Sequence, residues 1–201
     1  MTTWVKEDDD TLTELGKAQA EDLGENWADV HIDYIYTSPL ERAKDTALAL
    51  AKHNKAHPKV IESVKLKEQD LGPVVNDLMS RYRRDEAFFE RTGQSVRSYK
   101  PSRGLHRSHC PPDGESLDEV TSRGISAILE IMNTHGVELS TPPKEMSMRL
   151  SQFSPQQLVD GLPHIVIVSH NIFMCELYEG IKSWNKPKHE EGDTKYANTC
   201  W

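Results

Sequence analysis

The organisation of the chain is clearest in residues 31–51, HIDYIYTSPLERAKDTALALA. Residues 31–36 form a short run rich in isoleucine and tyrosine, which predicts a strand. Ser38 then suits a helix N-cap, with Pro39 in the first helical position and Glu41 completing a capping box. Apolar residues recur behind them at helical spacing. The stretch therefore predicts a strand, a tight turn and an amphipathic helix.

Arg42 falls in the first turn of that predicted helix, just beyond the carboxyl end of the strand. Open α/β sheets bind ligands at this edge, and unpaired backbone N–H groups at a helix N-terminus favour an anion. A guanidinium there would hold a phosphate or a carboxylate through two hydrogen bonds. On these residues alone, a solvent-exposed arginine without a ligand explains the pattern equally well.

Length, charge and cysteine content restrict the class of protein. The chain has 201 residues and a formal net charge of -8, which predicts one domain over residues 1–201 and argues against a nucleic-acid partner. No run approaches the length of a transmembrane helix and no signal-peptide pattern is present, so no membrane partner is expected. Three cysteines form no disulfide framework, which predicts a cytoplasmic location. Nothing in the sequence indicates the oligomeric state.

Other segments extend the alternation of helices and strands. Capping boxes at residues 11–14 and 116–119 predict the starts of two amphipathic helices. Apolar and polar residues alternate over residues 60–66, which predicts a strand. The β-branched run 164–169 predicts a strand buried on both faces. A helix is expected over residues 172–182. Strands separated by helices predict an α/β fold with a parallel sheet.

Two segments lack this regular pattern. Residues 73–112 predict a loop or helical insertion over the ligand-binding edge, because long loops inside compact domains are often functional. Residues 136–163 predict a surface excursion. His106, His109 and Cys110 lie close in sequence, but their spacing is loose and no carboxylate pattern accompanies them, so no metal site is predicted.

The segment SPLERAKDTA, residues 38–47, resembles the second signature of the histidine phosphatase superfamily, the phosphoglycerate-mutase-like proteins. Residues 12–20, 114–116 and 166–170 match further motifs in the family's order. The resemblance covers roughly residues 11–200. It implies a three-layer phosphoglycerate-mutase-like fold and phosphomonoester hydrolysis or phosphoryl transfer through phosphohistidine. It also implies a small phosphorylated substrate or phosphate as the partner, with no cofactor and no metal.

The resemblance assigns roles to three residues that each follow a predicted strand. Arg42 is expected to bind the phosphate, His170 to donate to its oxygens, and Glu68 to act as the general acid. Strand ends of a parallel sheet gather at one edge, so the three are expected to lie together. A charged His170 would make phosphate binding weaken as pH rises. The alternatives are a packed or capping histidine and an exposed carboxylate. Asn171 stands where the family usually has glycine.

The family's nucleophile is a histidine in an Arg-His-Gly motif at the end of its first strand. The first ten residues here contain no histidine and no apolar strand. We therefore expect a phosphoglycerate-mutase-like sheet without its first strand, in a chain truncated at its N-terminus and inactive or weakly active. One alternative is a non-catalytic module that binds phosphorylated ligands, a pseudophosphatase. Another is a non-functional product that depends on a partner strand.

Overall fold

The computed structural model describes residues 10–77, 107–138 and 161–190. Most of the predicted insertion over residues 73–112, and most of the predicted excursion over residues 136–163, lies outside these ranges. Within them, no helix combines the length and the apolar character needed to cross a bilayer.

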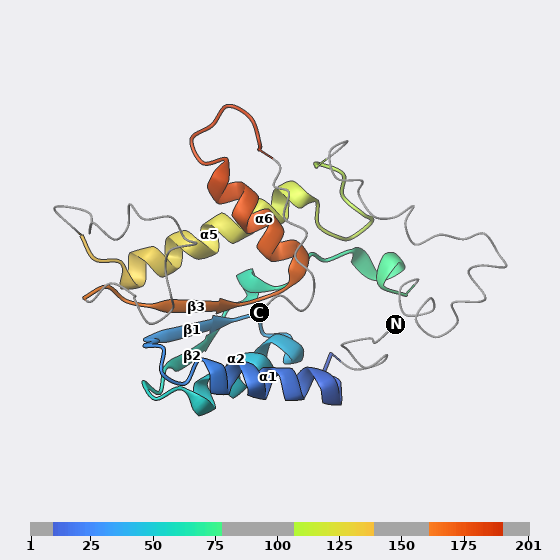
Figure 1. Ribbon diagram of the computed structural model, residues 1–201. Coiled ribbons are helices and arrows are strands. Elements are labelled where there is room, and N and C mark those ends of the chain that lie inside the picture. Colours follow the sequence, from blue (N-terminus) through green and yellow to red (C-terminus); the bar gives the residue numbers. More distant parts are fainter. Residues whose placement is uncertain (1–9, 78–106, 139–160, 191–201) are drawn as a thin grey trace.

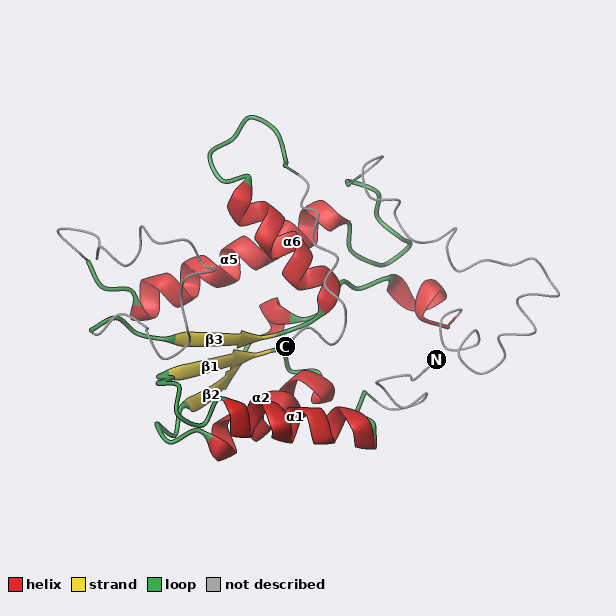
Figure 2. Ribbon diagram, in the orientation of Figure 1, coloured by secondary structure: helices red, strands yellow, loops and turns green. Residues whose placement is uncertain are grey.

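Strands and helices alternate along the described parts of the chain (Figure 2). The elements are, in order, α1 (Glu14–Asn26), β1 (Tyr34–Thr37), α2 (Glu41–His53), β2 (Lys59–Glu62), the 3-10 helix η1 (Val64–Leu66), α5 (Leu117–His135), β3 (Ile165–Val168) and α6 (Asn171–Lys182). Residues 72–77 are also helical.

The three strands form a parallel sheet in the order β2-β1-β3. Tyr34 of β1 is opposite Lys59 on one side and Ile165 on the other. Helices α1 and α2 cover one face of this sheet, and α5 and α6 cover the other (Figure 1). The predicted α/β fold with a parallel sheet and three layers is confirmed.

Alternate side chains of the strands enter two separate cores, as the pleat of a sheet requires. On the α1/α2 face, Ile35 is fully buried with Leu50, and Val166 packs against them. On the α5/α6 face, Tyr36 and Ile167 pack against a cluster that contains Phe173. The sheet therefore separates two apolar cores, and packing on both faces fixes the position of its strand ends.

Two of the predicted helix starts are wrong by two residues. Helix α1 is capped by Thr13, whose side chain accepts a hydrogen bond from the Gly16 amide at 3.1 Å. Helix α2 begins at Glu41, later than predicted, and its N-cap Leu40 has no side chain that can cap it. The predicted box at Ser116 is present in full, and α6 begins within one residue of the prediction.

The strand predictions fail in two details. Strand β2 ends at Glu62, and residues 64–66 form the 3-10 helix instead of continuing the strand. Strand β3 packs against both cores, but each of its four residues is only half-buried, less than the prediction implied. Among the described residues β3 pairs only with β1, so its outer edge lacks a neighbouring strand to cover it. The β-branched sequence correctly predicted a strand, but it did not predict how deeply that strand is buried.

Candidate functional site

The carboxyl ends of the three strands meet segments that cross from one to the next. The Ser38 amide donates to the Val168 carbonyl at 3.0 Å, which ties the turn after β1 to the end of β3. The Ser63 amide donates to the Thr37 carbonyl at 2.9 Å, and the Ser169 hydroxyl donates to the Leu66 carbonyl at 2.6 Å. These bonds bring the first residues of α2 and α6 and the segment after η1 to one edge.

Arg42 lies at this edge, and a carboxylate occupies the anion position beside it. Asp10 forms an ion pair with the Arg42 guanidinium. The same carboxylate accepts the Glu41 backbone amide at 2.9 Å, and the Asp10 carbonyl accepts the Arg42 amide at 2.9 Å. Asp10 thus supplies the cap that Leu40 cannot give to α2. A residue of the chain itself, Asp10, therefore occupies the position at this helix terminus where the sequence predicted an anion, and the phosphate-binding role of Arg42 stays a prediction.

His170 is the N-cap residue of α6 and is only 7 % exposed. Burial, together with the positive charges of Arg42 and Arg123, lowers the pKa of His170 from 6.5 to about 3. The imidazole is therefore neutral near pH 7, which corrects the expectation of a charged donor there. Its Nε2 atom is buried and forms no hydrogen bond with any described residue.

Glu68 lies beside the same helix terminus, facing backbone amides. Its carboxylate accepts the Phe173 amide at 2.9 Å and the Ile172 amide at 3.3 Å. The amide of Gln69 donates to it as well, at 3.0 Å. In this arrangement Glu68 caps α6, and its predicted role as general acid stays a prediction. The edge thus gathers Arg42, His170 and Glu68, as the topology predicted.

A second arginine, Arg123 of α5, was not singled out in the sequence. Its guanidinium forms a two-pronged pair with Glu115, with nitrogen–oxygen distances of 2.9 and 2.8 Å. It also donates to the carbonyl oxygens of Lys65 and Lys67, and lies 5.4 Å from the ring centre of Phe173. Arg123 therefore fixes the backbone that carries Glu68 and adds positive charge near His170.

A signal for Arg123 was present in the sequence. It lies three residues after Val120 and four before Ala127, and both of these are buried. A cation on the apolar stripe of a helix needs a specific set of acceptors. The same reasoning explains Glu115, whose role the sequence left undetermined: it balances the Arg123 charge and accepts the Asp70 amide at 3.0 Å.

Asn171 proves compatible with its position. It is the first residue of α6 and is not among the described residues with positive φ. A helical backbone conformation needs no glycine, so the family's usual residue is not required for this turn.

The chemistry of this edge is that of an anion site. It offers the Arg42 guanidinium, which also pairs with Asp10, and the buried His170 Nε2 atom, which can donate when that nitrogen carries the proton. These donors suit the non-bridging oxygens of a phosphoryl group, which carry dispersed negative charge. Two carboxylates cap the flanking helices and would lie at the border of such a ligand.

Known proteins share both the sequence pattern and the fold. A sequence profile of the histidine phosphatase superfamily (branch 1) matches residues 2–139. The fructose-2,6-bisphosphatase TIGAR of Xenopus tropicalis is 29% identical over 117 residues, which are 57% of this chain and 38% of the relative. The metal-independent phosphoserine phosphatase of Arabidopsis thaliana is 34% identical over 128 residues, 62% of this chain and 49% of the relative. The chain thus spans half or less of these two relatives.

Solved structures agree on the fold. A mycobacterial glucosyl-3-phosphoglycerate phosphatase aligns with a TM-score of 0.57 and 21% identity, covering 85% of this chain and 67% of that one. A phosphoglycerate mutase from Bacillus anthracis aligns with a TM-score of 0.51 and 20% identity, covering 92% of this chain and 73% of that one. With the profile match over more than half of its length, the chain belongs to the histidine phosphatase superfamily, branch 1.

Proposed function

We propose that this chain binds the phosphoryl group of a small phosphorylated ligand at the carboxyl edge of its sheet. Arg42 forms one side of the proposed site, and His170 Nε2 forms the other. Phosphomonoester hydrolysis or phosphoryl transfer is the reaction class we assign to the site, by membership of the superfamily. A second structure of the mycobacterial glucosyl-3-phosphoglycerate phosphatase, which also resembles this fold, contains inorganic phosphate. This supports phosphate as the ligand class.

The observation that carries the proposal is the buried Nε2 atom of His170. It has no hydrogen bond with a described residue, although two arginines lie close enough to lower the imidazole pKa. A buried polar atom without a partner is costly, so such atoms often mark ligand positions. A phosphate oxygen would accept a hydrogen bond from Nε2 and so satisfy this atom.

Turnover needs a further group that we expect the 201-residue polypeptide to lack. No Arg-His-Gly sequence occurs in it. His170 is neutral and is the N-cap residue of α6. We therefore propose that this polypeptide by itself binds phosphate esters with little or no phosphohistidine chemistry, as a pseudophosphatase would. A cytoplasmic location remains part of the proposal, supported by the small number of cysteines.

A phosphate titration followed by NMR tests the site. Inorganic phosphate is added to the wild-type chain, to Arg42→Gln and to Lys44→Gln. Lys44→Gln is the matched control, because it removes a cation from the same helix. Lys44 itself pairs with Glu62 on the surface, at 2.6 Å. We expect about millimolar binding by the wild type, since charged hydrogen bonds contribute roughly 1.5–3 kcal/mol each.

Arg42→Gln should weaken phosphate binding by about tenfold or more, while Lys44→Gln should change it by less than about twofold. Equal binding by the wild type and Arg42→Gln would contradict the proposed site. Turnover is checked separately, by incubation with a phosphate ester and detection of acid-labile phosphate. A stoichiometric phosphohistidine on this polypeptide would contradict the proposed lack of turnover but not the binding site.

A further inference from the structure

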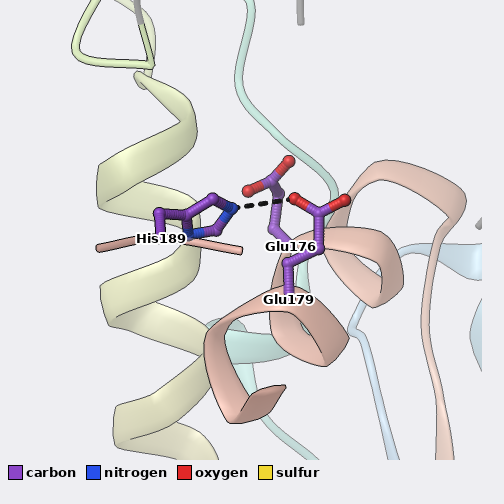
Figure 3. A group of neighbouring side chains, drawn as sticks. All are labelled: Glu176, Glu179 and His189. Carbon is purple, nitrogen blue, oxygen red and sulfur yellow. Dashed lines mark hydrogen bonds and ion pairs between the residues drawn. The ribbon is translucent and has the colours of Figure 1, made fainter. Parts of the chain in front are cut away.

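Helix α6 carries a second group of polar side chains, well away from its N-terminus. Glu176 and Glu179 are one helical turn apart and are 0 % and 2 % exposed. His189 approaches them from the segment that follows the helix (Figure 3). One ligand-type atom from each of the three lies within 4.8 Å of the others. The three side chains point toward a common point between α6 and this segment.

The hydrogen bonds of Glu176 are divided unequally between its two oxygens. Oε2 accepts from the Thr121 hydroxyl at 3.0 Å and from the guanidinium of Arg107. Oε1 is buried and has no hydrogen bond with a described residue. Two donors therefore hold the carboxylate by one oxygen, and the other oxygen is left without a donor among the described residues. A buried polar oxygen that has no donor is unfavourable, even where the other oxygen of the same carboxylate is paired.

Glu179 is the second carboxylate of the cluster. Its Oε2 atom lies 2.9 Å from His189 Nε2 and 3.5 Å from the Arg107 guanidinium. Two carboxylates bring two negative charges, and Arg107 brings one positive charge.

We propose that Glu176, Glu179 and His189 bind one divalent transition-metal ion, with Zn²⁺ as the best match. Carboxylate oxygen and imidazole nitrogen are both zinc ligands, and three protein ligands leave a position for water. Binding requires the proton on His189 Nε2 to move to Nδ1 or to solvent. Arg107 and Thr121 keep their bonds to Oε2 of Glu176 and orient that ligand from outside the metal shell.

This ion would have a structural role distinct from the proposed phosphate site. Glu176 is six residues after His170, which places it roughly 9 Å farther along the helix at 1.5 Å per residue. Two of the three ligands come from α6 and the third from the segment after it. The ion would therefore fasten residues 183–190 to α6, and Arg107 would add the loop before α5 to the same point.

A calorimetric titration with Zn²⁺ tests the proposal on the full 201-residue chain, in a buffer that does not chelate metals. The wild type should bind one equivalent and show a higher Tm when Zn²⁺ is present. His189→Ala should bind about 100-fold more weakly, since even the loss of an outer partner of a metal ligand costs about 10–100-fold. His31→Ala is the matched control: His31 also pairs with a carboxylate, Asp33 at 3.2 Å, but lies outside the cluster. It should keep the wild-type affinity.

Glu176→Gln provides a second test, because the amide removes the ligand charge while keeping the shape. It should abolish the zinc-dependent rise in Tm. Its folding is checked first by circular dichroism, and if it does not fold, His189→Ala decides the question, since that side chain is 23 % exposed. The absence of saturable zinc binding by the wild type, or equal affinity of the wild type and His189→Ala, would overturn the proposal.

Discussion

The N-termini of α2 and α6 solve the same structural problem with different electrostatic results. Each helix follows a parallel strand, and neither has a side-chain hydrogen bond from its own N-cap residue. Each receives a carboxylate from a distant segment instead. Asp10 accepts the Glu41 amide of α2 at 2.9 Å, and Glu68 accepts the Phe173 amide of α6 at 2.9 Å.

The difference lies in what each carboxylate has beside it. Asp10 pairs with Arg42, so the α2 terminus combines a cation with a chain-borne anion that competes for it. Glu68 lies beside His170, whose lowered pKa keeps the imidazole neutral. In the proposed phosphate site, the α2 terminus would therefore set how strongly the anion is attracted, and the α6 terminus would supply an uncharged donor that orients it. The two similar caps would thus make different contributions to the one proposed site.

The largest expected effect concerns the α6 side and the pH dependence of stability. The folded pKa of His170, about 3, is below its ordinary value of 6.5. Between about pH 3 and pH 6.5 the unfolded chain therefore binds a proton at His170 that the folded chain excludes. The stability of the fold is unaffected by the titration of His170 above pH 6.5 and decreases as pH falls below it. Relative to His170→Gln, the wild type should lose up to about 1.4 kcal/mol of unfolding free energy per pH unit below 6.5.

Urea unfolding of the two proteins from pH 7 to pH 4.5 measures this difference. The exposed His31→Gln serves as a control and should follow the wild type. Parallel stability curves for the wild type and His170→Gln would show that the imidazole at the α6 terminus is not held neutral, and the contrast with α2 would disappear.

The two caps should differ in their contribution to stability. Loss of a helix cap costs roughly 0.5–2 kcal/mol. Glu68 accepts three backbone amides, whereas Asp10 accepts one and its side chain is 32 % exposed. We expect Glu68→Ala to lower the free energy of unfolding by about 2 kcal/mol, and Asp10→Ala by about 1 kcal/mol. Chemical denaturation measures both values, and the reverse order would contradict the comparison.

The smallest effect concerns the competition at α2. Asp10→Asn keeps a hydrogen-bond acceptor for the Glu41 amide but removes the negative charge beside Arg42. Partly exposed ion pairs contribute up to about 1 kcal/mol, so phosphate affinity should rise about threefold. Asp33→Asn is the control, because Asp33 caps the His164 amide at 2.7 Å at the opposite end of the strands. Unchanged or weaker phosphate binding by Asp10→Asn would mean that Asp10 does not compete with the ligand.

Much of the fold followed from local patterns in the sequence. The spacing of apolar residues identified the helices and strands. The rule that the carboxyl ends of parallel strands share an edge predicted that Arg42, Glu68 and His170 lie together. The start of α2 was wrong because Ser38, Pro39 and Glu41 satisfy the local rules for a cap so well. The actual cap, Asp10, is 31 residues before Glu41 in the chain, and no local rule reaches that far.

The electrostatics of the site could not be predicted in the same way. Whether His170 is charged depends on its burial and on Arg123, a residue of α5 that contacts the site only after folding. Asp10 directly precedes α1 in the sequence, yet its carboxylate caps α2. The cluster of Glu176, Glu179 and His189 also depends on a chain reversal after α6, so its sequence spacing gives little warning of it.

The central claim is that His170 is a neutral residue whose Nε2 atom contacts the bound phosphate. Nitrogen-15 NMR of the histidine side chains tests it directly, with the His170 signals assigned by their absence in His170→Gln. We predict that His170 remains neutral from pH 8 to pH 5 without phosphate, and that its Nε2 resonance shifts in a saturable manner when phosphate is added. A His170 that titrates near pH 6.5, or an Nε2 resonance that phosphate leaves unchanged, would contradict this account.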